Sequence, residues 1–297
     1  MNCITLILMG VLTQMQVSTD PPAYSRGILK GIDIPTPSFA ASIPEDELKD
    51  LSWIHFAVPD FVILSIDKQQ GLYLSQNIQL FKTWILDRWG LDNLVFSKPV
   101  FVVCVPNKDL MSKLFQLKSS YSEVRMKNDK IDSIVLWLVL DAPPPDVIPN
   151  SLTIPVLEEF KQASQWKMPF WVSRGMAMLN KTTTKIREDI KYLSGIKTPL
   201  DIDAIVNMTE EKFKKLPEEQ RKMIDKQCAV LVLLFRKEYG QDKLHLFLKD
   251  NSLEELGFKN RKQFEGIVHR YYQNLMSDIV NNVTPDQYLD IKRKEVY

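Results

Sequence analysis

The stretch "SLTIPVLEEFKQASQWKMPFWVSRGMAML", residues 151–179, decides the interpretation of the fold. Its apolar residues recur at helical spacing on both sides of a short polar segment, so the pattern predicts helices over 150–165 and 169–180. The first helix carries the polar run "EEFKQ" (158–162), and the second opens with Trp-x-Ser-x-Gly. The question is whether this polar run belongs to a functional site or is only the solvated face of an amphipathic helix.

The region before these helices predicts an α/β half with a mixed sheet. Extended runs rich in β-branched and aromatic residues alternate with runs of helical spacing. The expected elements are a strand over 54–66, a helix over 72–89 ended by Gly90, a strand over 98–106, a helix capped by Asn107, and strands over 121–126 and 131–140. This order gives one sheet with helices packed on it.

After Pro149 the chain is expected to be helical. The remaining predicted helices cover 183–195, 209–239 with a break near Pro217, 242–249 and 260–276. The fold class is therefore α+β, an N-terminal mixed-sheet α/β half followed by a helical half. The predicted parts are an N-terminal segment (1–51), an α/β subdomain (52–145) and a helical subdomain (146–297), with the 150–165 helix at the junction of the two halves.

Composition limits the classes of partner. Thirty-eight basic and thirty-seven acidic residues leave a net charge of +1, so no overall field attracts nucleic acid. No Gly-rich phosphate-binding motif occurs in the sequence. The three cysteines, Cys3, Cys104 and Cys228, are too scattered for a zinc site or a disulfide framework, and the last two are expected to be small buried apolar residues.

The first 51 residues leave two interpretations open. An apolar run over 3–12 has the length of an export-signal core and is too short to span a bilayer, but no basic residue precedes it. It is either an export signal or a buried N-terminal segment, and a Pro-rich connector over 20–45 follows it. The compartment therefore stays open, with an exported or virion-associated protein among the alternatives, and no transmembrane span is expected.

Three motifs in order resemble the gluzincin-type zinc metallopeptidases of the peptidase MA clan. They are "KPVFVVCVP" (98–106), "PFWVSRGMAML" (169–179) and "QCAVLVLLFRKEYG" (227–240). The resemblance covers about residues 52 to 276 and implies a gluzincin-like fold. In that family a helix bearing His-Glu-x-x-His and a following Trp-x-Ser-Glu-Gly segment supply the zinc ligands.

This chain departs from the family at the ligand positions. Aligned on the tryptophan, the two histidines correspond to Glu158 and Gln162, the catalytic glutamate to Glu159, and the third ligand to Arg174. A catalytic zinc needs three neutral-imidazole or carboxylate ligands and an open position for water, and a permanent guanidinium cation repels a divalent ion. The resemblance thus implies a degenerate site with no zinc, no other cofactor and no catalytic residue.

Arg174 suggests a further hypothesis. Its cation stands where the family has a zinc-binding glutamate, so we expect it to bond to Glu158 or Glu159 in place of the metal bridge. The three histidines, His55, His245 and His269, have no partner at ligand spacing and are expected to be structural.

Two functions remain open from the sequence. The first is a non-catalytic, gluzincin-like structural or binding subunit of a larger assembly, such as a virion or a secreted complex, with protein partners. The alternative is a hydrolase with a metal-independent site that uses Glu158 and Glu159 as its acid/base pair. The alternative is disfavoured because adjacent residues of a helix diverge by about 100°, whereas paired catalytic carboxylates face each other.

Overall fold

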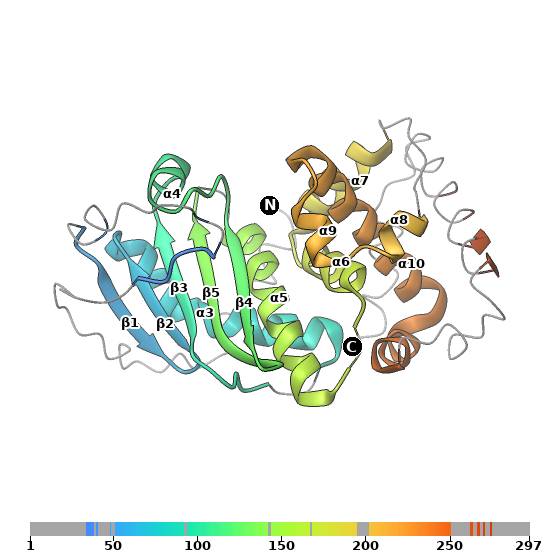
Figure 1. The fold of residues 1–297 in the computed structure, drawn as a ribbon, viewed down its shortest axis with the longest axis horizontal. Helices are drawn as coiled ribbons and strands as arrows, with labels where there is room; N and C mark the ends of the chain where they lie inside the picture. Colours follow the sequence, from blue (N-terminus) through green and yellow to red (C-terminus); the bar gives the residue numbers. More distant parts are fainter. Residues whose placement is uncertain are drawn as a thin grey trace, which may run out of the picture.

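The computed structural model describes most of the chain after residue 50. The described residues are 34–38, 40, 48, 51–91, 94–141, 144–166, 168–194 and 202–250, together with 262, 263, 266, 267, 270 and 274. Figure 1 shows a sheet at one end of the molecule, helices at the other end, and α5 between them.

The sheet has five strands in the order β1-β2-β3-β5-β4. The strands are β1 (Ile54–Val58), β2 (Phe61–Ser65), β3 (Val100–Val105), β4 (Tyr121–Lys127) and β5 (Lys130–Val139). The three central strands β2, β3 and β5 run parallel, and the two outer strands pair antiparallel with their neighbours. The predicted mixed sheet is therefore confirmed.

The expected single strand over 54–66 is wrong, because the chain turns back at its middle. β1 and β2 form an antiparallel hairpin in which Val58 pairs with Phe61. Asp60 has a φ of 64°, a left-handed conformation that aspartate adopts more readily than a β-branched residue. Its carboxylate accepts a 2.6 Å bond from Lys82 of the following helix. The turn consists of only two residues within an apolar run, which is why the hydrophobic pattern conceals it.

Helices α3 (Lys68–Trp89) and α5 (Pro144–Ser164) cover one face of the sheet (Figure 1). The side chain of Asp67 caps α3 by accepting from the Gln70 amide, and Gly90, with a φ of 58°, ends the helix as predicted. Helix α4 (Lys108–Phe115) begins at the predicted cap Asn107 and packs in a smaller apolar cluster on the other face.

A segment from the N-terminal part of the chain crosses that second face. The indole of Trp137 donates to the Pro35 carbonyl at 3.0 Å, and the Ser38 amide donates to Glu123 at 3.1 Å. Arg125 also donates to the carbonyl of Thr36. The apolar run over 3–12 lies outside the described residues.

Helix α5 begins six residues earlier than predicted and contains Pro149 and Pro155. A proline in a helix removes one backbone hydrogen bond, which usually ends the helix. Here Leu152 and Val156 are fully buried between the sheet and the next helix, so tertiary packing outweighs the local preference of proline.

The helical half consists of five further described helices. They are α6 (Phe170–Leu179), α7 (Thr183–Ser194), α8 (Ile202–Val206), α9 (Glu210–Lys214) and α10 (Glu218–Asp250). The predicted break near Pro217 separates α9 from α10, and Gly240, with a φ of 74°, interrupts α10 where the predicted 242–249 helix was to begin. Of the predicted 260–276 helix, the described residues are helical and the rest lies outside the described part.

One apolar cluster runs from the sheet through α3 and α5 into α6 and α10. A buried hydrogen-bond chain crosses the same junction. The indole of Trp89 donates to Asn180 at 3.1 Å, and the Asn180 amide donates to Thr153 at 2.7 Å. Helix α5 thus lies between the two halves, as expected of the 150–165 helix, whereas the proposed boundaries of the three parts stay predictions. Within the described residues, no helix combines the length and apolarity needed to cross a membrane.

Candidate functional site

Glu159 of α5 is buried and binds a loop of the chain. Its side chain is 4 % exposed. One carboxylate oxygen accepts from the Ser97 amide at 3.0 Å and the other accepts from the Ser97 hydroxyl at 3.1 Å. This carboxylate therefore fixes the segment that enters β3, and both of its oxygens already have partners.

The other two polar residues of the "EEFKQ" run have separate partners. Glu158 forms an ion pair with Lys161, one turn along α5, at 2.8 Å. Gln162 accepts from the backbone amide of Ile131, near the start of β5, at 3.2 Å. The interpretation of this run as only the solvated face of an amphipathic helix is thus incomplete. Glu159 is buried, and Gln162 binds the sheet. Glu158 and Glu159 engage different groups, so their contacts give no support to an acid/base pair.

Arg174 of α6 binds Asp225 of α10, not a glutamate of α5. Its Nε donates to Oδ1 at 2.7 Å and its Nη2 to Oδ2 at 2.6 Å. The guanidinium also lies over the Phe213 ring, 4.7 Å from the centroid. The expected bond from Arg174 to Glu158 or Glu159 is therefore wrong. Asp225, 51 residues further along the chain, is the partner of Arg174 instead. It accepts two parallel charge-assisted bonds in a half-buried site, which is a strong arrangement for a guanidinium and a carboxylate.

The electrostatics of Arg174 follow from this pair. Burial acts to lower the pKa of Arg174, but the charge and hydrogen bonds of Asp225 outweigh that effect and leave the pKa above its ordinary value. The guanidinium therefore carries a fixed positive charge on α6. Such a charge opposes the binding of a divalent cation there.

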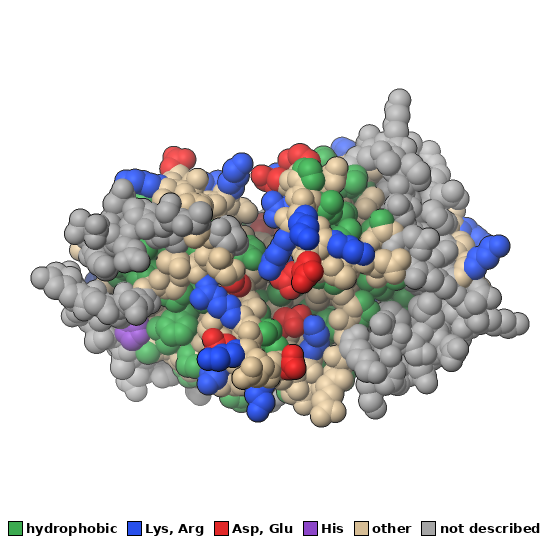
Figure 2. Space-filling view, in the orientation of Figure 1, with side chains coloured by type: hydrophobic (Ala, Val, Ile, Leu, Met, Phe, Trp, Pro, Cys, Tyr) green, Lys and Arg blue, Asp and Glu red, His purple; other side chains and the backbone are tan. Residues whose placement is uncertain are grey.

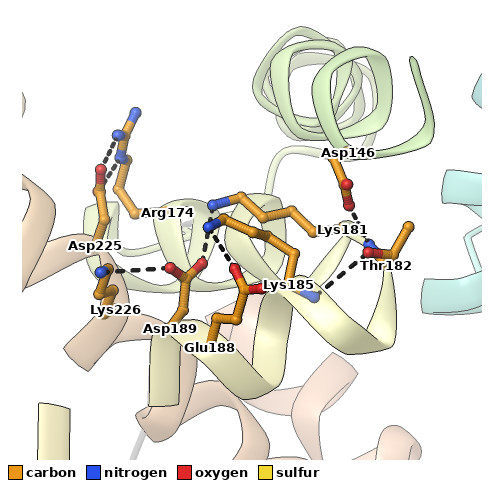
Figure 3. A network of polar contacts seen from close by, with 9 residues as sticks. All are labelled: Asp146, Arg174, Lys181, Thr182, Lys185, Glu188, Asp189, Asp225 and Lys226. Atoms are coloured by element: carbon orange, nitrogen blue, oxygen red, sulfur yellow. Dashed lines mark hydrogen bonds and ion pairs between the residues drawn. The ribbon is translucent and has the colours of Figure 1, made fainter. Parts of the chain in front are cut away.

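A second set of polar contacts connects α7 to α10 and to the residues that follow α6 (Figure 3). Asp189 of α7 receives Lys181, which follows α6, at 3.1 Å and Lys226 of α10 at 3.4 Å. The Lys226 ammonium lies 3.6 Å from the centroid of the Tyr192 ring. The backbone amide of Thr182 donates to Asp146 of α5 at 2.8 Å. No local spacing in the sequence predicts this network, because its members belong to different helices.

The Trp-x-Ser-x-Gly segment lies within α6 and has a packing role. Trp171 is buried with its ring centroid 5.5 Å from that of Phe235, and the Ser173 hydroxyl donates to the Phe170 carbonyl at 2.8 Å. At Gly175 α6 lies so close to α10 that an added Cβ would come within 2.4 Å of the Cys228 carbonyl oxygen. Trp166, which precedes α6, packs edge-on against Phe160.

The described histidines and cysteines lie in separate parts of the fold. In the described part of the chain, no group of three or more histidine, cysteine, aspartate or glutamate residues is placed to hold a metal ion. His245 lies with Nε2 2.6 Å from the Trp89 carbonyl oxygen, His55 is on the edge strand β1, and His269 falls outside the described residues. Cys104 and Cys228 are buried as predicted. Burial raises the pKa of Cys104 to about 12, which excludes a thiolate nucleophile at neutral pH.

Charge on the visible surface is mixed. Figure 2 shows lysine, arginine, aspartate and glutamate side chains interspersed over the face that joins the two halves.

Neither the models of known protein families nor the curated proteins compared with this chain give a match. The chemistry of the chain is therefore inferred from its own residues.

Proposed function

We propose that this chain is a gluzincin-like protein without zinc and without peptidase activity, which serves as a structural or binding subunit of a larger protein assembly. The observation that carries the proposal is the bidentate Arg174–Asp225 pair. A fixed cation, neutralised by an acid from another helix, occupies the position that corresponds to the third zinc ligand. The pair holds α6 to α10, a connection that requires no metal.

The contacts of Glu159 and Gln162 support the same proposal. Glu159 holds the Ser97 segment, and Gln162 holds the first residues of β5. A catalytic base needs to be within reach of a water molecule, whereas Glu159 is 4 % exposed and both of its oxygens face Ser97. These residues therefore have structural roles on a scaffold that resembles a peptidase, and a scaffold can outlast its chemistry.

Zinc content tests the first part of the proposal. We expect the protein, purified without chelators and dialysed against zinc, to hold far less than one zinc per chain by elemental analysis. Near-stoichiometric zinc that disappears in Glu158→Ala would contradict the degenerate site.

A restored variant tests the resemblance itself. Glu158→His, Gln162→His and Arg174→Glu recreate the family's ligand set, and Asp225→Asn removes the acid that would otherwise repel the new glutamate. If the scaffold is gluzincin-like, the variant binds one zinc per chain, because residues at i and i+4 share a helix face. The matched control keeps Arg174 and Asp225 and carries only the two histidines, and we expect weaker binding there. A folded restored variant that binds no zinc would count against the gluzincin-like arrangement.

Copurification tests the binding role. Native tagged protein should retain at least one other protein in stoichiometric amount through size-exclusion chromatography at moderate salt. A monomer without companions, together with hydrolysis of a peptide or glycoside that is lost in Glu159→Gln, would favour the hydrolase alternative instead.

A further inference from the structure

Four side chains on one face of the sheet hold a short segment from the N-terminal part of the chain. Tyr121, Glu123 and Arg125 alternate along β4, so their side chains lie on the same face of the sheet. Trp137 of β5 pairs directly with Tyr121, and the two rings stack with their centroids 5.9 Å apart. We call these four residues the docking face, and residues 34–38, which cross it, the strap (Figure 1).

The strap has a restricted backbone shape before it docks. Its sequence is Ile-Pro-Thr-Pro-Ser, with prolines at positions 35 and 37. The ring of a proline fixes φ at about −65°, and the residue before a proline is restricted to extended conformations. The local sequence therefore favours an extended backbone over the first four residues of the strap. Such a segment loses little conformational entropy when it docks on a surface.

The docking face binds the backbone of the strap. The Trp137 indole donates to the Pro35 carbonyl at 3.0 Å. Arg125 donates to the next carbonyl along the strap, and Glu123 accepts from the Ser38 amide at 3.1 Å. Because proline has no N–H group, a Pro-x-Pro segment brings carbonyl acceptors to these donors and has few backbone donors of its own to satisfy. The chemistry of the face thus fits an extended segment with alternating prolines.

Apolar packing adds to these hydrogen bonds. Ile34 packs against the apolar cluster beneath the docking face, and Pro37 is buried, whereas Ser38 is exposed. The residues that bond to the strap lie 85 to 102 positions further along the chain. These contacts depend on the shape and groups of the strap and not on its covalent connection to the sheet. The strap of a second copy therefore presents the same groups to the face.

We infer that the docking face also binds the strap of a second copy of this chain, so that copies brought close together exchange their straps. The occupant is a second copy, because the strap already fits the face and every copy carries one. The chain between position 38 and Leu48, which packs in the same apolar cluster, spans up to about 35 Å when extended, so a strap can reach a neighbouring face.

The strap of the same chain competes with the incoming one. Its effective concentration is on the order of millimolar, so exchange requires a high local concentration of the protein, as in an assembly. This inference goes beyond the proposed function, because it concerns copies of one chain and holds with or without a zinc site.

Two full-length variants test the exchange by complementation. Trp137→Phe keeps the strap but removes the indole donor of the docking face, and Ile34→Asp keeps the face but removes the apolar anchor of the strap. In sedimentation velocity at about 100 µM we expect each variant alone to be a monomer and the mixture to contain a 1:1 heterodimer. The reason is that a carbonyl left without its donor weakens docking by about tenfold, so the intact strap prefers the intact face. The matched control mixes Trp137→Phe with the double variant Ile34→Asp/Trp137→Phe and should stay monomeric, because neither chain has an intact face.

A synthetic peptide of residues 32–40 gives a second measurement that does not depend on how Trp137→Phe folds. By fluorescence anisotropy it should bind Ile34→Asp at least about tenfold more tightly than the wild type, whose own strap competes. The same peptide with both prolines changed to alanine should bind about threefold more weakly, because it is no longer held extended.

Three results would overturn the inference. The first is a mixture that stays monomeric although both variants are folded by circular dichroism. The second is a peptide that binds the wild type and Ile34→Asp equally, or binds neither. The third is peptide binding without association of the chains, which would assign the docking face to a proline-containing segment of another protein in place of a second copy.

Discussion

The sheet half and the helical half use charged side chains differently. In the sheet half, Glu123 and Asp60 bind groups close to the sheet, namely the Ser38 segment and Lys82 of the adjacent helix. In the helical half, Asp225 and Asp189 connect one helix to another. Strands are already positioned by the backbone ladder, whereas helices satisfy their backbone bonds internally. The relative placement of helices therefore depends on side chains alone.

The comparison has a functional consequence. A metal ion between two helices is one way to fix their relative position, and a bidentate ion pair is another. In the helical half the second device is present at Arg174 and Asp225.

Gly175→Ala should give the largest loss of stability. The added Cβ would lie 2.4 Å from the Cys228 carbonyl oxygen, and backbone in the middle of a packed helix cannot move aside cheaply. We expect the free energy of unfolding in urea to fall by about 3 kcal/mol, even though alanine favours helix over glycine.

The matched substitution in the sheet half is Gly71→Ala. There the added Cβ meets Cε2 of Phe56, also at 2.4 Å, but the obstacle is the edge of a side-chain ring. We expect a loss of about 1 kcal/mol or less, since the ring can shift and helix propensity compensates. Equal losses in the two variants would show that the close approach of α6 to α10 is no tighter a constraint than ordinary side-chain packing.

The sequence predicted elements better than it predicted their contacts. Long apolar runs and glycine or asparagine caps placed α3, β3, α4 and α6 within a few residues, because these signals are local. The β1–β2 turn and the start of α5 were missed, since one is two residues long and the other depends on the burial of Leu152 and Val156. The predicted bond of Arg174 to a glutamate of α5 is wrong. No local pattern in the sequence relates Arg174 to Asp225, because the two positions are 51 residues apart.

The Arg174–Asp225 pair should show strong coupling in a double-mutant cycle. The two side chains are 29 % and 14 % exposed, so removing one leaves a poorly solvated charge. With Arg174→Met and Asp225→Leu we expect a coupling free energy of about 2 kcal/mol in urea unfolding, and a double variant more stable than the sum of the single losses implies.

The control cycle combines Arg174→Met with Glu158→Ala. Glu158 pairs with Lys161, so we expect coupling within about 0.5 kcal/mol of zero. Strong coupling to Glu158 and none to Asp225 would restore the original hypothesis, in which the arginine replaces a metal bridge to α5, and would erase the contrast between the halves.

Glu123→Gln tests the corresponding charge of the sheet half and should have a smaller effect than the loss of the Arg174–Asp225 pair. Burial acts to raise the pKa of Glu123, but bonds from Ser38 and Arg125 outweigh it and leave the pKa below its ordinary value. A carboxyl with a lowered folded-state pKa stabilises the protein above its unfolded-state pKa, and this stabilisation disappears as the pH falls through the folded-state value.

We therefore expect the free energy of unfolding of the wild type to exceed that of Glu123→Gln by about 1 kcal/mol at neutral pH. The difference should begin to shrink near pH 4.5, the ordinary value, and vanish at lower pH. Urea unfolding in steps down to about pH 3 measures it, with exposed Glu211→Gln as the control that shows no such difference. A difference that grows on acidification would mean that Glu123 is held protonated in the folded state, and its role in holding the Ser38 segment as an anion would be wrong.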